Sequence, residues 1–225
     1  MDAEENTADH GWEAACPFAG AVTSMERLRM VLPSPNQTTT AKIQRGLDHH
    51  CRTFISLSTF VTLATCNADG ACDSSPRGGP PGFIVALDER HLLIPESPGN
   101  RMADTLGNII ERPRIGMMMV IPGIGETLRI NGDAWVIEDA NLLARAGIMG
   151  KAPILGIGVR VHEAFIHCAK AFMRGGLWNR TAWPDRSPLA PVARIIRDHG
   201  RGVIGDGSVG AVEAAIEESY TQRLW

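Results

Sequence analysis

The chain has 225 residues, of which 44% are hydrophobic and 21% are charged, and its formal net charge is -3. This composition is typical of a globular protein, and the slightly acidic balance argues against a nucleic-acid-binding protein, which is usually basic. The length favours one main domain, because a single hydrophobic core fills well at this size.

The first residues, MDAEENTADHGWEAACPF, are acidic and contain neither a basic nor an apolar segment of the kind found in signal peptides. No apolar run reaches the length of a transmembrane helix, so we expect no membrane contact. The five cysteines form no C-x-x-C pair, which argues against both a disulfide framework and a zinc site. We therefore expect a cytoplasmic protein with reduced thiols and no metal.

The elements can be predicted in chain order. Residues 1–38 are expected to form an N-terminal arm. A helix is predicted from Thr40, because Ile43, Leu47 and Phe54 recur at helical spacing. The period then changes to two, and short strands separated by turns are predicted in STFVTLATC, ACDSSP, GFIVAL, HLLIP, RIGMMMVIPG, ETLRINGDAWVIED and ILGIGVRVHEAFIHC. Short strands linked by tight turns favour an antiparallel barrel over a βαβ sheet.

Helices are predicted over 101–112, over 143–148 and in the last part of the chain, in PVARIIRDH and VGAVEAAIEESYTQRLW. We expect residues 39–180 to form the barrel and residues 181–225 to form a helical extension packed on it. GRGVIG, at 200–205, matches a dinucleotide-binding pattern but follows a helical segment instead of a strand, so a loop is predicted.

One junction, IPESPGNRMADTL at 94–106, combines the signals for a strand end, a turn and a helix start. Pro95 ends the strand, because proline cannot donate to the ladder, and Asn100 is predicted to cap the helix, with Arg101 in its first turn. Backbone N–H groups and a guanidinium would then meet there, which is the chemistry of a phosphate site. An ordinary capped helix with a solvated arginine is the alternative.

Two further clusters carry candidate ligand contacts. In SSPRGGPPGF, at 74–83, glycine would let a planar ligand approach the backbone, with Arg77 beside it, although the segment taken alone favours a bulge or loop between two strands. In HCAKAFMRGGLW, at 167–178, Lys170 and Arg174 would share a helix face, which is usually a solvated face.

Five motifs, SPRGG, PGNR, DTLGNI, ETLRING and a late HCAKA followed by LW, occur together over roughly residues 25–180. With them the sequence resembles the pyridoxamine 5'-phosphate oxidase-like, FMN-binding split-barrel family, in particular its branch of FMN-dependent enzymes. The resemblance implies a mainly β fold with flanking helices (α+β), built on a six-stranded antiparallel split β-barrel. It also implies a homodimer with FMN bound at the subunit interface.

The resemblance further implies which residues contact the cofactor. Asn100 and Arg101 would hold the phosphate, and the strand segment from Ser75 would run along the flavin edge. His167 is the candidate for a catalytic proton donor. The full cofactor-binding set implied is Ser75, Arg77, Gly78, Ile94, Pro95, Asn100, Arg101, Glu126, Thr127 and Arg129, with Lys170, Arg174 and Trp178 from the partner subunit.

We therefore expect an FMN-dependent oxidoreductase that acts on an unidentified small molecule, with NADH or NADPH as a possible electron donor. Vitamin B6 oxidation is not expected, because LWNRTAWPDRSPLAP stands where true pyridoxamine phosphate oxidases carry an Arg-x-His-Asp-Arg-like segment. The alternative is a non-catalytic carrier of flavin, haem or the deazaflavin F420 on the same fold, since one fold supports several functions.

Overall fold

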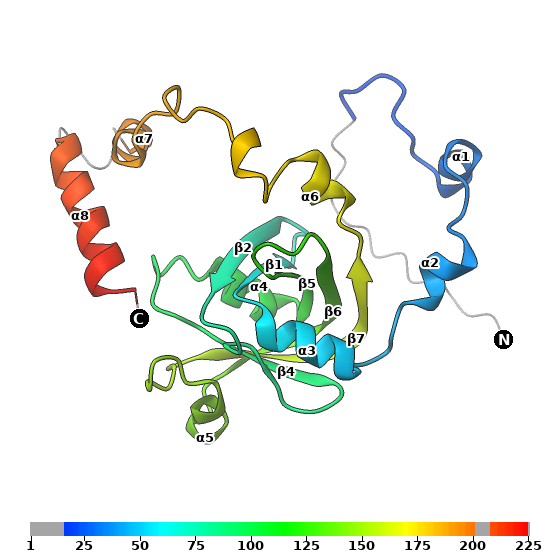
Figure 1. The fold of residues 1–225 in the computed structure, drawn as a ribbon, viewed down its shortest axis with the longest axis horizontal. Coiled ribbons are helices and arrows are strands. Elements are labelled where there is room, and N and C mark those ends of the chain that lie inside the picture. Colours follow the sequence, from blue (N-terminus) through cyan, green and yellow to red (C-terminus); the bar gives the residue numbers. More distant parts are fainter. Residues whose placement is uncertain (1–15, 201–207, 225) are drawn as a thin grey trace.

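The computed structural model describes residues 16–200 and 208–224 of the chain. Its centre is an antiparallel sheet of seven strands in the order β2-β1-β5-β6-β7-β4-β3, curled into a split barrel (Figure 1). The mainly β fold with flanking helices is confirmed, but the expected number of six strands is wrong, because the two-residue β3 also pairs with β4. The strands are β1 Phe60–Cys66, β2 Cys72–Gly78, β3 Val85–Ala86, β4 His91–Pro95, β5 Arg114–Val120, β6 Thr127–Ile137 and β7 Gly156–His167.

The alternation of apolar and polar residues in the sequence corresponds to the two faces of this sheet. Val61 on β1 pairs with Met119 on β5, which pairs with Leu128 on β6, and all three side chains are fully buried. Residues one position away, such as Thr62 and Met118, point to the opposite side and are half-buried. We call the side of Val61 the inner face and the other side the outer face.

The sheet curls far enough to bring its two edges close to each other. β2 is one edge of the sheet, whereas β4 lies beside the other edge. Nevertheless Arg77 on β2 donates from Nε to Glu96 Oε2, just after β4, at 3.0 Å, and both side chains are largely shielded from solvent. The inner-face side chains are thereby enclosed as one core.

Two helices complete this core. α3, His49–Leu57, contributes Cys51 and Ile55, and α4, Asp104–Glu111, contributes Ile109. The helix predicted from Thr40 does not run through to α3. Instead the chain makes a backbone bridge from Gln44 to Ala164, and α3 begins where the Asp48 carboxylate accepts from the Cys51 N–H at 2.8 Å.

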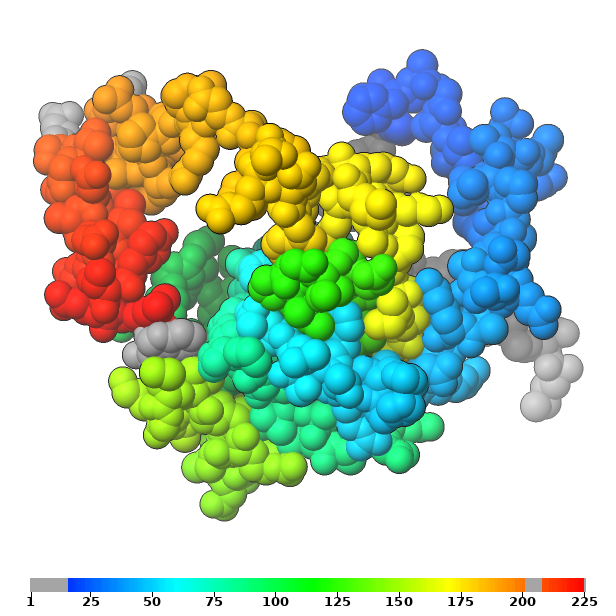
Figure 2. Space-filling view, in the orientation of Figure 1, coloured from blue at the N-terminus to red at the C-terminus, as the bar shows by residue number. Residues whose placement is uncertain are grey.

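The remaining helices lie outside the barrel. α7 and α8 pack against each other, and Figure 2 shows them on the opposite side of the molecule from α1 and α2. Packing of residues 181–225 on the barrel stays a prediction. Residues 1–15 of the arm and most of GRGVIG lie outside the described residues.

The outer helices are α1 Met25–Val31, α2 Gln37–Ala41, α5 Ala140–Leu143, α6 Lys170–Arg174, α7 Val192–His199 and α8 Val209–Gln222, with 3-10 turns at Ala144–Ala146 and Arg180–Ala182. None of the described helices has the length and apolar character needed to cross a bilayer.

One buried carboxylate, on β6, binds side chains from β5 and β7 on the outer face of the sheet. Asp133 accepts hydrogen bonds from Arg160, from Arg114 at 2.7 Å and from His162 at 2.9 Å. These donors, with the Arg160 bond as the largest cause, hold the pKa of Asp133 below its ordinary value. Asp133 follows an irregularity in the β6–β7 register between Asn131 and Gly132.

We expect Asp133→Asn to lower the free energy of unfolding by about 1–3 kcal/mol at pH 7, the range for hydrogen bonds to a charged group. Because the folded-state pKa is lowered, this stabilisation is complete above the ordinary carboxyl pKa and is lost as the pH falls through the lower folded value. Urea unfolding of both proteins at pH 7 and below pH 4 should therefore show the difference shrinking in acid. The exposed Glu89→Gln is the control, and a difference independent of pH would contradict the prediction.

Gly132 lies where the backbone of β7 comes close to that of β6. A Cβ at this position would come within 2.1 Å of the Arg160 carbonyl oxygen, so Gly132→Ala must displace backbone. We expect a loss of about 2–3 kcal/mol in denaturant unfolding. Gly107 in α4 is the matched control, because a Cβ there meets nothing within 4 Å, and Gly107→Ala should be neutral or stabilising. Equal stability of the two variants would contradict the close approach.

Candidate functional site

The junction between β4 and α4 differs from its predicted geometry. β4 ends at Pro95 as expected, but α4 begins only at Asp104. Asn100 is not the helix cap, because its Oδ1 accepts from the Met102 N–H at 3.0 Å and closes a local turn instead. Arg101 is correspondingly not in the first helical turn; it precedes the helix and is exposed.

This junction leaves the start of α4 open. Arg101 and Ala103 have φ values of 63° and 60°, the left-handed region that non-glycine residues seldom adopt. The residue before the helix, Ala103, has no side chain that can accept from the first N–H groups, and no side chain caps α4. The first backbone N–H groups of the helix and the Arg101 guanidinium are therefore available to an anion.

β2 carries the SPRGG motif as a regular edge strand as far as Gly78, and the segment becomes a loop from Gly79. Alternate residues Asp73, Ser75 and Arg77 face inward and are half-buried. Ser75 donates to Asp73 at 2.8 Å, and Thr105 in α4 donates to the same carboxylate oxygen at 3.4 Å. Pro76 is tolerated because β2 is an edge strand and this position makes no ladder hydrogen bond, so no N–H is needed there. Gly78, the last residue of β2, pairs with Phe60.

The two β4 residues of the predicted site lie deeper than the rest. Ile94 is fully buried and belongs to the main core, so its side chain packs against protein. Pro95 is buried beside Gly156 of β7. The backbone at the end of β4, next to Glu96, is therefore what this strand can offer to a ligand.

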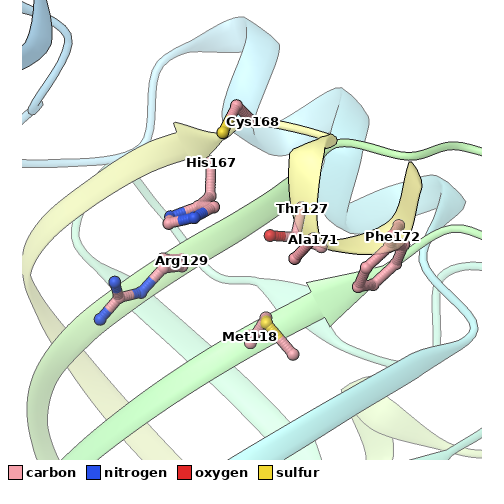
Figure 3. A pocket seen from close by; sticks show the side chains of 7 residues that line it. All are labelled: Met118, Thr127, Arg129, His167, Cys168, Ala171 and Phe172. Atoms are coloured by element: carbon pink, nitrogen blue, oxygen red, sulfur yellow. The ribbon is translucent and has the colours of Figure 1, made fainter. Parts of the chain in front are cut away.

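A pocket of about 310 Å³ opens on the outer face, where β5 and β7 end and β6 begins (Figure 3). Thr127 pairs directly with His167, so the two side chains leave the same side of the sheet. Arg129 lies next to them, with its guanidinium 5.2 Å from the centre of the Phe165 ring. The lining residues are Met118, Thr127, Arg129, His167, Cys168, Ala171 and Phe172.

α6 forms the upper wall of this pocket. It begins at Lys170, and both Lys170 and Arg174 are exposed at its surface. Trp178 anchors the segment that follows, because its Nε1 donates to the Ile124 carbonyl at 2.8 Å and its ring packs edge-on against Phe172, 5.8 Å away. Glu126 is exposed immediately before β6.

The structure thus sorts the predicted residues into two groups. The first, which we call the junction group, comprises Ser75, Arg77, Asn100 and Arg101 on β2 and between β4 and α4. The second, the pocket group, comprises Thr127, Arg129, His167, the α6 residues Lys170 and Arg174, and Trp178. The β2 side chains face inward, whereas the pocket opens on the outer face, so one chain does not gather both groups around one ligand.

The sequence did not reveal the apolar half of the pocket. Met118 alternates with the buried Met117 and Met119, and only this period-two pattern could have indicated that its side chain faces outward. Ala171 and Phe172 lie between the two basic residues of α6, and their part in the pocket depends on how that helix folds back over β6.

Several solved structures are similar to this chain at low identity. HupZ from Group A Streptococcus is 17% identical, with a TM-score of 0.42 over 53% of this chain and 92% of its own. A protein related to general stress protein 26, from Clostridium acetobutylicum and described as of the pyridoxinephosphate oxidase family, is 11% identical, with a TM-score of 0.40 over 52% and 85%. HutZ, the heme storage protein from Vibrio cholerae, is 16% identical, with a TM-score of 0.36 over 53% and 94%.

The family of this chain is assigned from its sequence and not from these structural similarities. No protein with a curated description matches this chain. A family model described as pyridoxamine 5'-phosphate oxidase matches residues 47–165, which is more than half of the chain and extends from the approach to α3 nearly to the end of β7. The chain therefore belongs to the pyridoxamine 5'-phosphate oxidase family.

Proposed function

We propose that this chain binds FMN between the two subunits of a homodimer and acts as an FMN-dependent oxidoreductase on a small molecule. The observation that carries the proposal is the open start of α4, whose first N–H groups are uncapped and which the exposed Arg101 shortly precedes in the chain. Membership of the pyridoxamine 5'-phosphate oxidase family supports a phosphorylated flavin as the anion.

The donor set of the junction fits a phosphate ester. Backbone N–H groups at a helix start and a guanidinium are both strong donors to phosphate oxygens, and the helix dipole favours the negative charge. Asn100 stabilises the turn that presents these donors, through its bond to the Met102 N–H. In this proposal Asn100 therefore acts on the loop as well as on the ligand.

The separation of the two residue groups supports a dimeric site. A flavin lying along the edge strand β2 would be contacted by Ser75 and Gly78 of one subunit. The pocket group, including Lys170, Arg174 and Trp178, would have to come from the second subunit, since in one chain it lies on the outer face. Two-fold pairing would complete both sites at once, because such an interface uses the same surfaces twice.

FMN, when bound, supplies the chemistry of accepting and passing on a hydride or electrons. Arg129 is the best-placed residue to stabilise negative charge in the pocket, because no described carboxylate pairs with it, whereas Arg77 is paired with Glu96. His167 lines the same pocket and can hold or release a proton at an imidazole nitrogen. The apolar wall of Met118 and Phe172 would exclude water from a small substrate.

We expect Arg101→Ala to weaken FMN binding by about 10- to 100-fold, the effect of losing a charge-assisted hydrogen bond. Titration of FMN into the full chain, followed by quenching of flavin fluorescence, measures the affinity. Arg145→Ala, at another exposed arginine outside both groups, should leave the affinity unchanged. Equal affinities of wild type and Arg101→Ala would remove the phosphate assignment.

The dimeric site and the redox activity have separate tests. Light scattering of the FMN-loaded protein should give the mass of two chains, and a monomer with FMN bound would contradict the interface site.

Anaerobic addition of NADH or NADPH should bleach the flavin absorption, and other electron donors can be screened in the same way. Tight flavin binding with no reduction by any donor would favour a carrier, and a haem spectrum without flavin uptake would favour a haem protein.

A further inference from the structure

Two cysteines that the proposed function does not use face each other at the end of the β1–β2 hairpin. Cys66 and Cys72 are directly opposite in the register, and their Sγ atoms are 2.8 Å apart. In the next pair the Asn67 N–H donates to the Ala71 carbonyl at 3.0 Å. Cys66 and Cys72 therefore occupy a non-hydrogen-bonded position of the ladder, where opposite side chains come closest.

The backbone already has the spacing that a disulfide needs. Opposite Cα atoms at such a position lie about 4.5 Å apart, which is inside the range of about 4.4–6.8 Å that disulfides span. A covalent bond of about 2.05 Å would require the two sulfur atoms to approach by less than about 1 Å. Small side-chain rotations suffice, and the strands can stay in register.

The surroundings make this pair more accessible than the buried thiol of the chain. Cys72 is exposed and Cys66 is half-buried, whereas Cys51 lies in the core, where burial raises its pKa to about 11. The hydrogen bond between the two sulfur atoms raises the pKa of Cys66, and the positive charge of Arg112 opposes that shift. The exposure of Cys72 and the positive charge of Arg112 are the features of this pair that favour oxidation of a thiol.

We propose that Cys66 and Cys72 are a redox-active pair that peroxide oxidises, within one chain, to a disulfide that thiols reduce again. One thiol is oxidised by hydrogen peroxide to a sulfenic acid, with release of one water. The second thiol displaces the hydroxyl as another water while the S–S bond forms. Two thiols and one peroxide thus give one disulfide and two waters, with two electrons passing from sulfur to oxygen.

The bond would restrain a hairpin that is attached to α4. The Ala68 N–H donates to Glu111 at 2.9 Å, Arg112 donates to the Ala68 carbonyl at 3.3 Å, and Asn108 donates to the buried Thr65 at 3.0 Å. Closing the ring between Cys66 and Cys72 would stiffen the tip to which α4 is bound. The expected readout is slower amide exchange in residues 60–78 of the oxidised protein, by about tenfold.

The test uses the wild-type full chain, so it does not depend on whether a variant folds. Reduced protein is treated with hydrogen peroxide, and the remaining thiols are alkylated after unfolding. Trypsin leaves residues 53–77 as one peptide, because no lysine or arginine stands between Arg52 and Arg77. Cleavage before Asp69 then separates the two cysteines, so the halves stay together only if a disulfide joins them.

We expect the peptide to lose about 2 Da, to carry no alkyl group and to keep its halves joined until dithiothreitol is added. The matched control Cys16→Ser, at another exposed cysteine, should give the same result, whereas Cys66→Ser and Cys72→Ser should form no such link. Alkylation of both cysteines after peroxide, their oxidation to sulfinic acids, linkage to another chain, or a link that dithiothreitol leaves intact would each overturn the proposal.

Discussion

The alternation of side chains across a curled antiparallel sheet is the constraint on which the rest of this structure depends. Every second residue of β1, β5 and β6 enters one core, and the ion pair between Arg77 and Glu96 joins the two ends of the sheet around it. The same alternation decides which side chains remain available for function. A shift of one residue along any strand would exchange core and surface.

This constraint explains why the candidate site is divided. The junction group lies at the edge strand and just before α4, whereas the pocket group lies on the outer face, where β5 and β7 end and β6 begins. A second copy of the chain is the simplest way to unite them, because a two-fold axis can present the pocket group of each copy to the junction group of the other. The dimer is thus proposed because the two groups lie on different faces of the sheet.

α4 connects the features that carry chemistry. Its start is the uncapped end proposed to hold the anion, Ile109 anchors it in the core, and its C-terminal end binds the β1–β2 hairpin through Glu111 and Arg112. The cysteine pair lies at the tip of that hairpin, and β2 leads from it to the residues of the junction group. The hairpin tip and the junction therefore share one rigid support, although they are distant in the sequence.

The sequence by itself determined the strands, because a period of two and turn residues are local signals, and its motifs were sufficient to indicate the family. Local signals failed where longer-range contacts compete. Asparagine is a common helix cap, yet Asn100 closes a turn in the loop that leads from β4 to α4. Residues 42–48 are not helical, because Gln44 pairs with Ala164. Only the tertiary structure decided the division of the site, the pocket under α6 and the meeting of Cys66 with Cys72. Each depends on register, curl or packing between segments, and no single stretch of sequence encodes those relations.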